Sequence, residues 1–222
     1  MVTQLFTNVM QVIGSTGDNT VYTVPDTKTA IVNGVRRTEI TGNTPTYIIK
    51  IEDTSSNIFY ITPPVSVAAY STATIFDRPF VIAENEKLIV NSDAANQLDF
   101  FFAILEKDRG APSNYTNVMT DLTTTASTTL YTVPDEKIAI LNSWRITNTN
   151  ALAAASSTVN VTNATGTNFI WNSGTIAGYT GVQTVVRPMV LKEKEKIKIT
   201  AGTANYLHSV ASLLEITPTI RG

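Results

Sequence analysis

The chain carries one sequence pattern twice, and the second copy follows the first at a constant spacing of 109 residues. Residues 20–26 read TVYTVPD, and residues 129–135 read TLYTVPD. Over a longer stretch, residues 7–41 and 116–150 share 17 identities in 35 positions. The later part of each copy keeps the same spacing, so the copies differ by no net insertion or deletion. Two duplicated units therefore describe the chain better than a solenoid of many short repeats.

The repeat predicts two homologous domains, residues 1–109 and 110–222. Each has the size of one β-sandwich, roughly 100 residues, and chains well above ~40 residues bury a core without disulfides or metal. The chain has no cysteine, which excludes disulfides, a thiolate nucleophile and cysteine-bound zinc. Residues 107–114 (KDRGAPSN) combine charge with Gly, Pro and Ser, and we interpret them as a short linker.

Short segments rich in β-branched and aromatic residues alternate with turn residues in both copies. This spacing is typical of a sandwich or jelly roll, and no segment keeps a helical period. In the first copy we predict strands at residues 20–24, 30–40, 47–52, 58–62, 73–76, 80–82, 87–91 and 98–105. In the second copy we predict them at residues 138–149, 157–162, 169–171, 182–185, 189–191, 196–200 and 207–215. The predicted fold is all-β, with two tandem homologous β-sandwich (jelly-roll-like) domains.

The strand predicted at residues 138–149 alternates in its side chains, which assigns its two faces. One face is expected to carry Ile138, Ile140, Trp144 and Ile146, and the other Leu141, Ser143, Arg145 and Thr147. Trp144 takes the place of Val35 in the first copy, and we expect it to fill the core.

Two local signals could interrupt this pattern. Asn33-Gly34 alone would suggest a hairpin turn, but the counterpart Asn142-Ser143 lacks the glycine, so we predict a continuous strand that can hold a bulge here. The run 192–198 (KEKEKIK) could suggest a helix. Its counterpart 83–89 (AENEKLI) favours a turn that enters a strand, where the charges protect a sheet edge.

Charge and hydropathy exclude several classes of function. The formal net charge of −2 argues against nucleic-acid binding, which needs a basic face. Apolar runs stay short of the ~20 residues that span a bilayer, so we expect no membrane association. The opening sequence MVTQLFTNVMQVIG has no basic region and no long apolar region, so we expect no secretion by a signal peptide.

Residues that could support chemistry are few, and each has a simpler structural explanation. His208 is the single histidine, and it falls in a predicted strand without a nucleophile motif. Glu52 and Asp53 point to opposite faces if they lie in a strand, and the second copy lacks both. Residues 91–96 (NSDAAN) could offer oxygens to a cation, but one Asp and two Asn give only weak support for a calcium site. No phosphate-binding or dinucleotide-binding motif occurs. We therefore expect no catalytic residue, cofactor or metal, and no enzyme activity.

Two arginine positions occur in both copies, Arg36 with Arg145 and Arg78 with Arg187. Arginine is enriched at interfaces and pairs well with carboxylates. The four arginines are therefore candidate interface residues. The alternative is an internal salt bridge to a carboxylate that both copies share, at Asp26 and Asp135 or at Glu106 and Glu215.

The stretch YTVPD-x-K-x-A-I, at residues 22–31 and 131–140, is followed in both copies by P-x-V, E-x-E-K and a strand that ends in Leu-Glu. This pattern resembles a β-sandwich module of tailed-bacteriophage virion proteins, in which a segment like LYTVP-x-x-K-x-A-I opens a small all-β domain. The resemblance covers both halves of the chain. It implies a structural role in the virion, as in head decoration or cement proteins, head fibres, or tail and adsorption accessories.

Within that set the residues favour a capsid decoration protein, which needs no catalytic site, disulfide or secretion signal because particles assemble in the host cytoplasm. We expect it in the virion, bound to the major capsid protein or other virion proteins and to neighbouring copies. Three two-domain copies would present six similar domains, a pseudo-six-fold ring that matches a hexameric capsomer. A dimer at local two-fold positions is the alternative.

The main rival is a tail or fibre accessory module that binds a host receptor or glycan. Its candidate residues are Trp171, Tyr179 and Tyr206, and their exposure together in one cleft would favour it. The same aromatic residues can instead fill the core or an interface. A glycan-cleaving enzyme is a third class, and it would depend on Glu52 or Asp53.

Overall fold

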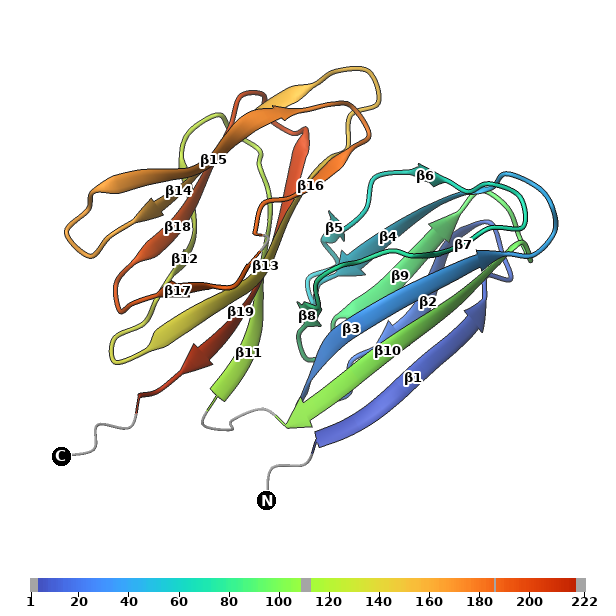
Figure 1. Cartoon of the computed structure of the whole chain (residues 1–222), viewed down its shortest axis with the longest axis horizontal. Coiled ribbons are helices and arrows are strands. Elements are labelled where there is room, and N and C mark those ends of the chain that lie inside the picture. The colour runs from blue at the N-terminus through green and yellow to red at the C-terminus, as the bar shows by residue number, and fades with distance from the viewer. Residues whose placement is uncertain (1–3, 109–112, 186, 219–222) are drawn as a thin grey trace. The chain divides into compact units, whose positions relative to one another are not determined.

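The computed structural model describes residues 4–108, 113–185 and 187–218 of the chain (Figure 1). Every helix or strand assigned in these residues is a β-strand, which confirms the predicted all-β class. The chain divides into two compact units, Met1–Arg109 and Gly110–Gly222, called domain 1 and domain 2 below.

Domain 1 is a sandwich of two antiparallel sheets. Its strands are β1 (Gln4–Val12), β2 (Gly17–Thr23), β3 (Lys28–Glu39), β4 (Thr46–Glu52), β5 (Ile58–Tyr60), β6 (Val65–Ser66), β7 (Thr72–Thr74), β8 (Phe80–Ile82), β9 (Lys87–Ser92) and β10 (Leu98–Asp108). One sheet has the order β1-β10-β3-β7 with β8 also on β3, and the other has β2-β9-β4-β5 with β6 on β4. The chain crosses repeatedly between the sheets, as in a jelly roll.

Domain 2 repeats this topology. Its strands are β11 (Ser113–Asp121), β12 (Thr128–Thr132), β13 (Ile138–Asn148), β14 (Ala155–Thr162), β15 (Asn168–Ile176), β16 (Gly181–Gln183), β17 (Met189–Leu191), β18 (Lys196–Ala201) and β19 (Leu207–Ile216). The sheets have the orders β11-β19-β13-β16, with β17 also on β13, and β12-β18-β14-β15. Both domains are thus tandem jelly-roll-like β-sandwiches, as the sequence predicted.

The first strand of each domain is missing from the predicted set. β1 pairs with β10 over its whole length, and β11 pairs in the same way with β19. The linker predicted at residues 107–114 is also partly wrong, because β10 continues to Asp108 and β11 begins at Ser113. Residues 109–112 of that segment lie outside the described residues. Lys107 is buried near the end of β10, so the polar composition of this segment did not identify a loop at this residue.

The predicted bulge in the long strand is confirmed in both domains. Asn33 is the extra residue where β3 pairs with β10, and Asn142 is the extra residue where β13 pairs with β19. The bulge reverses which side chains face the core. Before it, Ala139 and Leu141 are fully buried, and the predicted core positions Ile138 and Ile140 are only half-buried. That part of the face assignment is wrong.

Beyond the bulge the assignment holds. Trp144 and Ile146 are fully buried in the core of domain 2, which confirms Trp144 as a core residue. The indole Nε1 of Trp144 donates to Ser209 Oγ at 2.8 Å. A buried tryptophan needs such a partner, because an unpaired buried N–H is costly.

A tyrosine–glutamate hydrogen bond joins the two sheets of each domain. In domain 1, Tyr22 on β2 donates to Glu106 Oε1 on β10 at 2.8 Å. In domain 2, Tyr131 on β12 donates to Glu215 Oε1 on β19 at 2.7 Å. The tyrosine belongs to the YTVPD stretch and the glutamate to the closing Leu-Glu. The two repeated sequence signals are therefore the two ends of one structural contact.

The turns are also duplicated. Four pairs of equivalent non-glycine residues share a positive φ: Thr27 and Glu136, Tyr70 and Tyr179, Asn85 and Lys194, and Asn96 and Asn205. Such backbone is uncommon outside glycine. In the turn before β18, the Glu195 carboxylate accepts from Lys192 N at 2.9 Å, and Glu86 accepts from Ala83 N at 2.8 Å in domain 1. The turn predicted within residues 192–198 is thereby confirmed.

Candidate functional site

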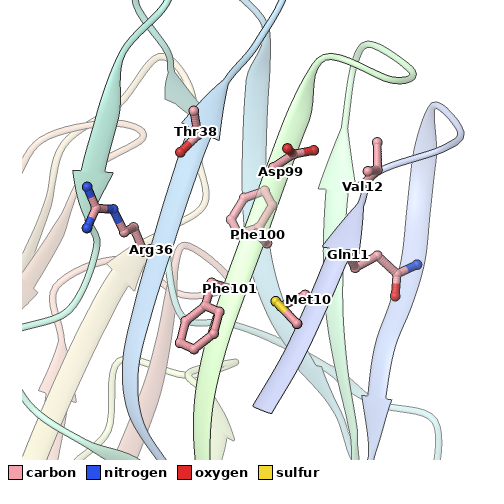
Figure 2. A pocket seen from close by; sticks show the side chains of 8 residues that line it. All are labelled: Met10, Gln11, Val12, Arg36, Thr38, Asp99, Phe100 and Phe101. Atoms are coloured by element: carbon pink, nitrogen blue, oxygen red, sulfur yellow. The ribbon is translucent and has the colours of Figure 1, made fainter.

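The outer face of the β1-β10-β3 sheet in domain 1 forms an apolar surface, which we call the domain 1 face. Its centre is a cross-strand row in which Met10 on β1, Phe101 on β10 and Arg36 on β3 lie side by side. Met10 is 72% exposed and Phe101 is 40% exposed. Figure 2 shows both side chains on the same side of the sheet, with Arg36 at its border.

A hollow of about 290 Å³ lies at this row. Its lining residues are Met10, Gln11, Val12, Arg36, Thr38, Asp99, Phe100 and Phe101. The next row of the sheet, Val12–Asp99–Thr38, supplies its polar side. One oxygen of Asp99, Oδ1, is buried and has no hydrogen-bond partner.

The apolar character extends along β1. Phe6 pairs with Leu105 on the same face as Met10 and is 76% exposed, and Val12 is 49% exposed. Exposed apolar patches of this kind mark interaction surfaces in monomeric proteins. Because the patch lies on two long strands of a packed sheet, it is a rigid surface and needs little ordering on binding.

Several equivalent positions of domain 2 are different, although Met119 and Arg145 keep the residue types of Met10 and Arg36. Val210 replaces Phe101 and is buried, and Asp121 replaces Val12. Asp121 is opposite His208 in the β11–β19 ladder, with 3.9 Å between His208 Nε2 and Asp121 Oδ1. Burial lowers the pKa of His208, and the Asp121 carboxylate opposes this shift. The two domains therefore share a scaffold but not this surface.

The four candidate arginines fall in two environments. Arg36 is exposed at the domain 1 face, and Arg187 is exposed beside a second hollow in domain 2. Arg78 and Arg145 are half-buried. Two of the carboxylates considered for an internal salt bridge, Glu106 and Glu215, accept hydrogen bonds from Tyr22 and Tyr131.

The second hollow, of about 490 Å³, contains one of the candidate aromatic residues. It is lined by Trp171, Thr184, Arg187, Pro188 and Met189. Trp171 is 48% exposed, and its Nε1 donates to the Thr184 carbonyl at 3.2 Å. Tyr179 is exposed but does not line this hollow, and Tyr206 packs against the domain 2 core. The structure thus joins Trp171 with Arg187 and does not place the three aromatic residues around one hollow.

The candidate acids are engaged in structural contacts. Glu52 Oε1 accepts from Lys87 Nζ at 2.7 Å. Partial burial of Asp53 is outweighed by hydrogen bonds from Asn57 and Ser55, which lower the pKa of this carboxyl. In the NSDAAN segment, Asp93 Oδ1 accepts from Thr46 N at 2.8 Å. Within the described residues, no group of three or more His, Asp or Glu could hold a metal ion.

No helix that could cross a membrane is found in the described part of the chain. The sequence reasoning also missed the main residues of the domain 1 face, Phe6, Met10 and Phe101. A signal was present in the run Phe100–Phe101–Phe102, because alternation in a strand forces the middle aromatic residue outward. Phe100 and Phe102 are buried, and Phe101 is exposed.

No protein-family model matches the chain, and no curated protein sequence matches it. Among solved structures, the major capsid protein P2 from Bacteriophage PM2 is 9% identical over 100% of both chains, with a TM-score of 0.33. The CBM22-1-CBM22-2 tandem domain of Paenibacillus barcinonensis Xyn10C is 9% identical over 98% of this chain and 91% of its own, at 0.26. The PBSX exported protein XepA is 8% identical over 93% and 86%, at 0.27. TM-scores this low leave the function to be argued from the site.

Proposed function

We propose that the chain is a non-enzymatic virion structural protein of a tailed bacteriophage, a capsid decoration or cement protein. The observation that carries this proposal is the domain 1 face, an exposed apolar surface on a rigid, duplicated jelly-roll scaffold. Both copies share the tyrosine–glutamate contact between their sheets, and its residues belong to the motifs that carry the sequence resemblance to phage virion modules. Jelly rolls serve in capsid proteins and lectins alike, so the site has to decide between them.

The site favours protein docking over catalysis or sugar binding. Met10 and Phe101 offer apolar area with an arginine at the border, a composition enriched in the centres of protein interfaces. The acids that could support hydrolysis are held by Lys87 and Asn57. The proposed partner is the major capsid protein of the shell, together with neighbouring copies of the chain.

The difference between the domains refines the proposed arrangement on the shell. Three copies would form a ring of six similar domains, matching a hexameric capsomer. Only the three copies of domain 1 would present Phe101, because domain 2 has buried Val210 there. The ring would then dock through alternate domains. A dimer at local two-fold positions would use two such faces.

Add-back to shells tests this proposal. Capsids from a phage that lacks the gene are mixed with the purified full chain, and bound protein is measured by co-sedimentation. The double variant Met10→Ser, Phe101→Ser should bind about tenfold or more weakly, because truncated anchors at an interface centre commonly cost more than 1 kcal/mol each. The control is Val190→Ser, an exposed apolar position of domain 2, at 60% exposure. Shells that bind no wild-type chain, or bind all three proteins equally, would contradict the proposal.

One observation favours the rival function, glycan or receptor binding by a tail or fibre module. Trp171 is exposed in a hollow beside Arg187, and an exposed indole beside a polar group suits the stacking of a sugar ring. The chain has two tryptophans, and Trp144 is fully buried, so a sugar-dependent fluorescence change would report Trp171. Saturable changes that vanish in Trp171→Phe would support the rival, and a flat titration would count against it.

A further inference from the structure

The end strand β15 of domain 2 is exposed over nearly its whole length. It has a sheet neighbour, β14, on one side only among the described strands (Figure 1). Eight of its nine residues are exposed, and only Ile176 is buried. Three consecutive apolar side chains stand in it, Phe169 at 55%, Ile170 at 71% and Trp171 at 48% exposure. Long, exposed apolar edge strands are templates for pairing with another chain.

The equivalent edge of domain 1 is protected, so the fold does not require an open edge. Its end strand β5 has three residues, Ile58–Tyr60, and Pro63 and Pro64 follow shortly after. The β4–β5 hairpin also carries Lys50 and Glu52. Short edges, prolines and charges are the usual means by which proteins prevent edge pairing. Domain 2 has none of the three at the same place.

The strands β14, β15 and β16 carry no charged side chain. Residues 146–186, which include β14, β15 and β16, contain no Asp, Glu, Lys, Arg or His. Two copies of β15 can therefore pair without a charged side chain of either strand in the contact. Conversely, β15 itself has no charge with which to select an oppositely charged partner, and Arg187 lies at its border, beside Trp171.

The order of side chains along β15 also suits a second copy. The bulky residues Phe169, Ile170 and Trp171 form its first half, and the small residues Ser173, Gly174 and Thr175 form its second half. Antiparallel pairing about a two-fold axis near Asn172 would place the bulky half of one strand opposite the small half of the other. A two-fold contact uses the same patch on both copies, so such self-complementarity is what it needs.

The bulge in β15 is compatible with this pairing. Trp171 is the extra residue relative to β14, since Val159 pairs with Asn172 and Asn160 pairs with Ile170. Its indole is bonded to the Thr184 carbonyl. The Trp171 side chain therefore turns toward the end of β16, and the side of β15 that faces away from β14 has no neighbouring strand among the described residues.

We infer that two copies of the chain pair through β15, antiparallel about a two-fold axis near Asn172, and so join two four-stranded sheets into one continuous sheet. The inference rests on the proposed function only where that function has the chain bind neighbouring copies. It names the surface that does so. The occupant is a second copy of this chain.

Sedimentation velocity of the full chain over a wide concentration range tests the inference. The wild type should pass from monomer to dimer as concentration rises. Ile170→Lys should weaken the dimer at least about tenfold, because it removes apolar area from the contact and places an unpaired charge there. Leu152→Lys is the control, since Leu152 is 98% exposed in the same domain but lies outside β15, and its dimer should equal that of the wild type. Ile170 is itself mostly exposed, so Ile170→Lys should fold, which circular dichroism checks.

Hydrogen exchange supplies the second readout. Amides of Asn172–Thr175 should exchange more slowly at a concentration that favours the dimer than at one that favours the monomer. A wild type that stays monomeric throughout would overturn the inference. So would an oligomer that Ile170→Lys leaves unchanged, or β15 amides whose exchange does not depend on concentration. Failure here leaves capsid binding by the domain 1 face untouched, and failure of capsid binding leaves this dimer intact, so the two outcomes are distinguishable.

Discussion

The tyrosine–glutamate bond that both domains repeat gives a stability prediction with an internal replicate. Tyr22→Phe removes one hydroxyl from domain 1 and keeps the ring. That hydroxyl donates to Glu106 Oε1 at 2.8 Å, and Glu106 is only 8% exposed, so its carboxylate would lose a donor where water has little access. Hydrogen bonds to charged groups contribute about 1.5–3 kcal/mol. For a domain of ~100 residues, the Tm should fall by on the order of 10 °C.

Thermal and denaturant unfolding of the full chain measure this loss. Tyr131→Phe breaks the equivalent 2.7 Å bond to Glu215 and should destabilise domain 2 by a similar amount. Tyr70→Phe is the control, because Tyr70 is 75% exposed. If neither Tyr22→Phe nor Tyr131→Phe changed the free energy of unfolding by more than about 0.5 kcal/mol, which is the usual range for surface substitutions, the reasoning would be refuted.

The same bond predicts a loss of stability in alkali. Burial, together with the hydrogen bond to glutamate, raises the pKa of Tyr22 and of Tyr131 above the ordinary value of 10.0. A pKa that is raised in the folded state gives stability that is fully present below the unfolded pKa and is lost as pH rises toward the folded one. The double variant Tyr22→Phe, Tyr131→Phe should therefore lose less stability than the wild type above pH 10. An equal loss would show that the two tyrosines do not govern this pH dependence.

Three further predictions concern a carboxylate, a glycine and enzyme activity. Although burial opposes the shift, hydrogen bonds from Thr41, Tyr70 and Gly42 lower the pKa of Glu39 to about 2. The stability that the Glu39 carboxylate contributes is therefore present above pH 4.5 and is lost as the pH falls toward 2. Across that window, the unfolding midpoint of Glu39→Gln should change less than that of the wild type. Gly178→Ala would put a Cβ 2.7 Å from the Ala151 carbonyl oxygen and should destabilise domain 2 by about 1–3 kcal/mol in denaturant unfolding, whereas Gly34→Ala meets nothing within 4 Å and should have little effect. The wild-type chain should release no reducing sugar from host glycans, and release that Glu52→Gln or Asp53→Asn abolished would instead establish an enzyme.

The repeat made the fold predictable, because identical residues at a constant spacing must occupy the same place in two similar domains. The YTVPD stretch and the closing Leu-Glu proved to be partners in one contact. The faces around Asn142 were less predictable, since a single extra residue reverses the alternation and has no distinctive sequence in this copy. β1 and β11 were missed because both are exposed or half-exposed edge strands, without the apolar alternation that identifies a buried one.

The candidate site depended on pairings that sequence alone does not give. The domain 1 face joins Met10 and Phe101, which are far apart in the chain, through the β1–β10 register. The exposure of Phe101 could have been anticipated from the run of three phenylalanines, but its neighbour could not. The sequence likewise could not show that the aromatic candidates of domain 2 lie apart. Tyr206 packs against the core, whereas Trp171 lies on an open sheet edge.

Immunogold labelling of intact virions tests the proposed function most directly. Antibody raised against the chain is conjugated to gold and imaged on particles of the phage that encodes it, with particles lacking the gene as the control. The account predicts gold distributed over the head of the wild-type virion. Gold confined to the tail or its tip would contradict it and would favour the receptor-binding alternative.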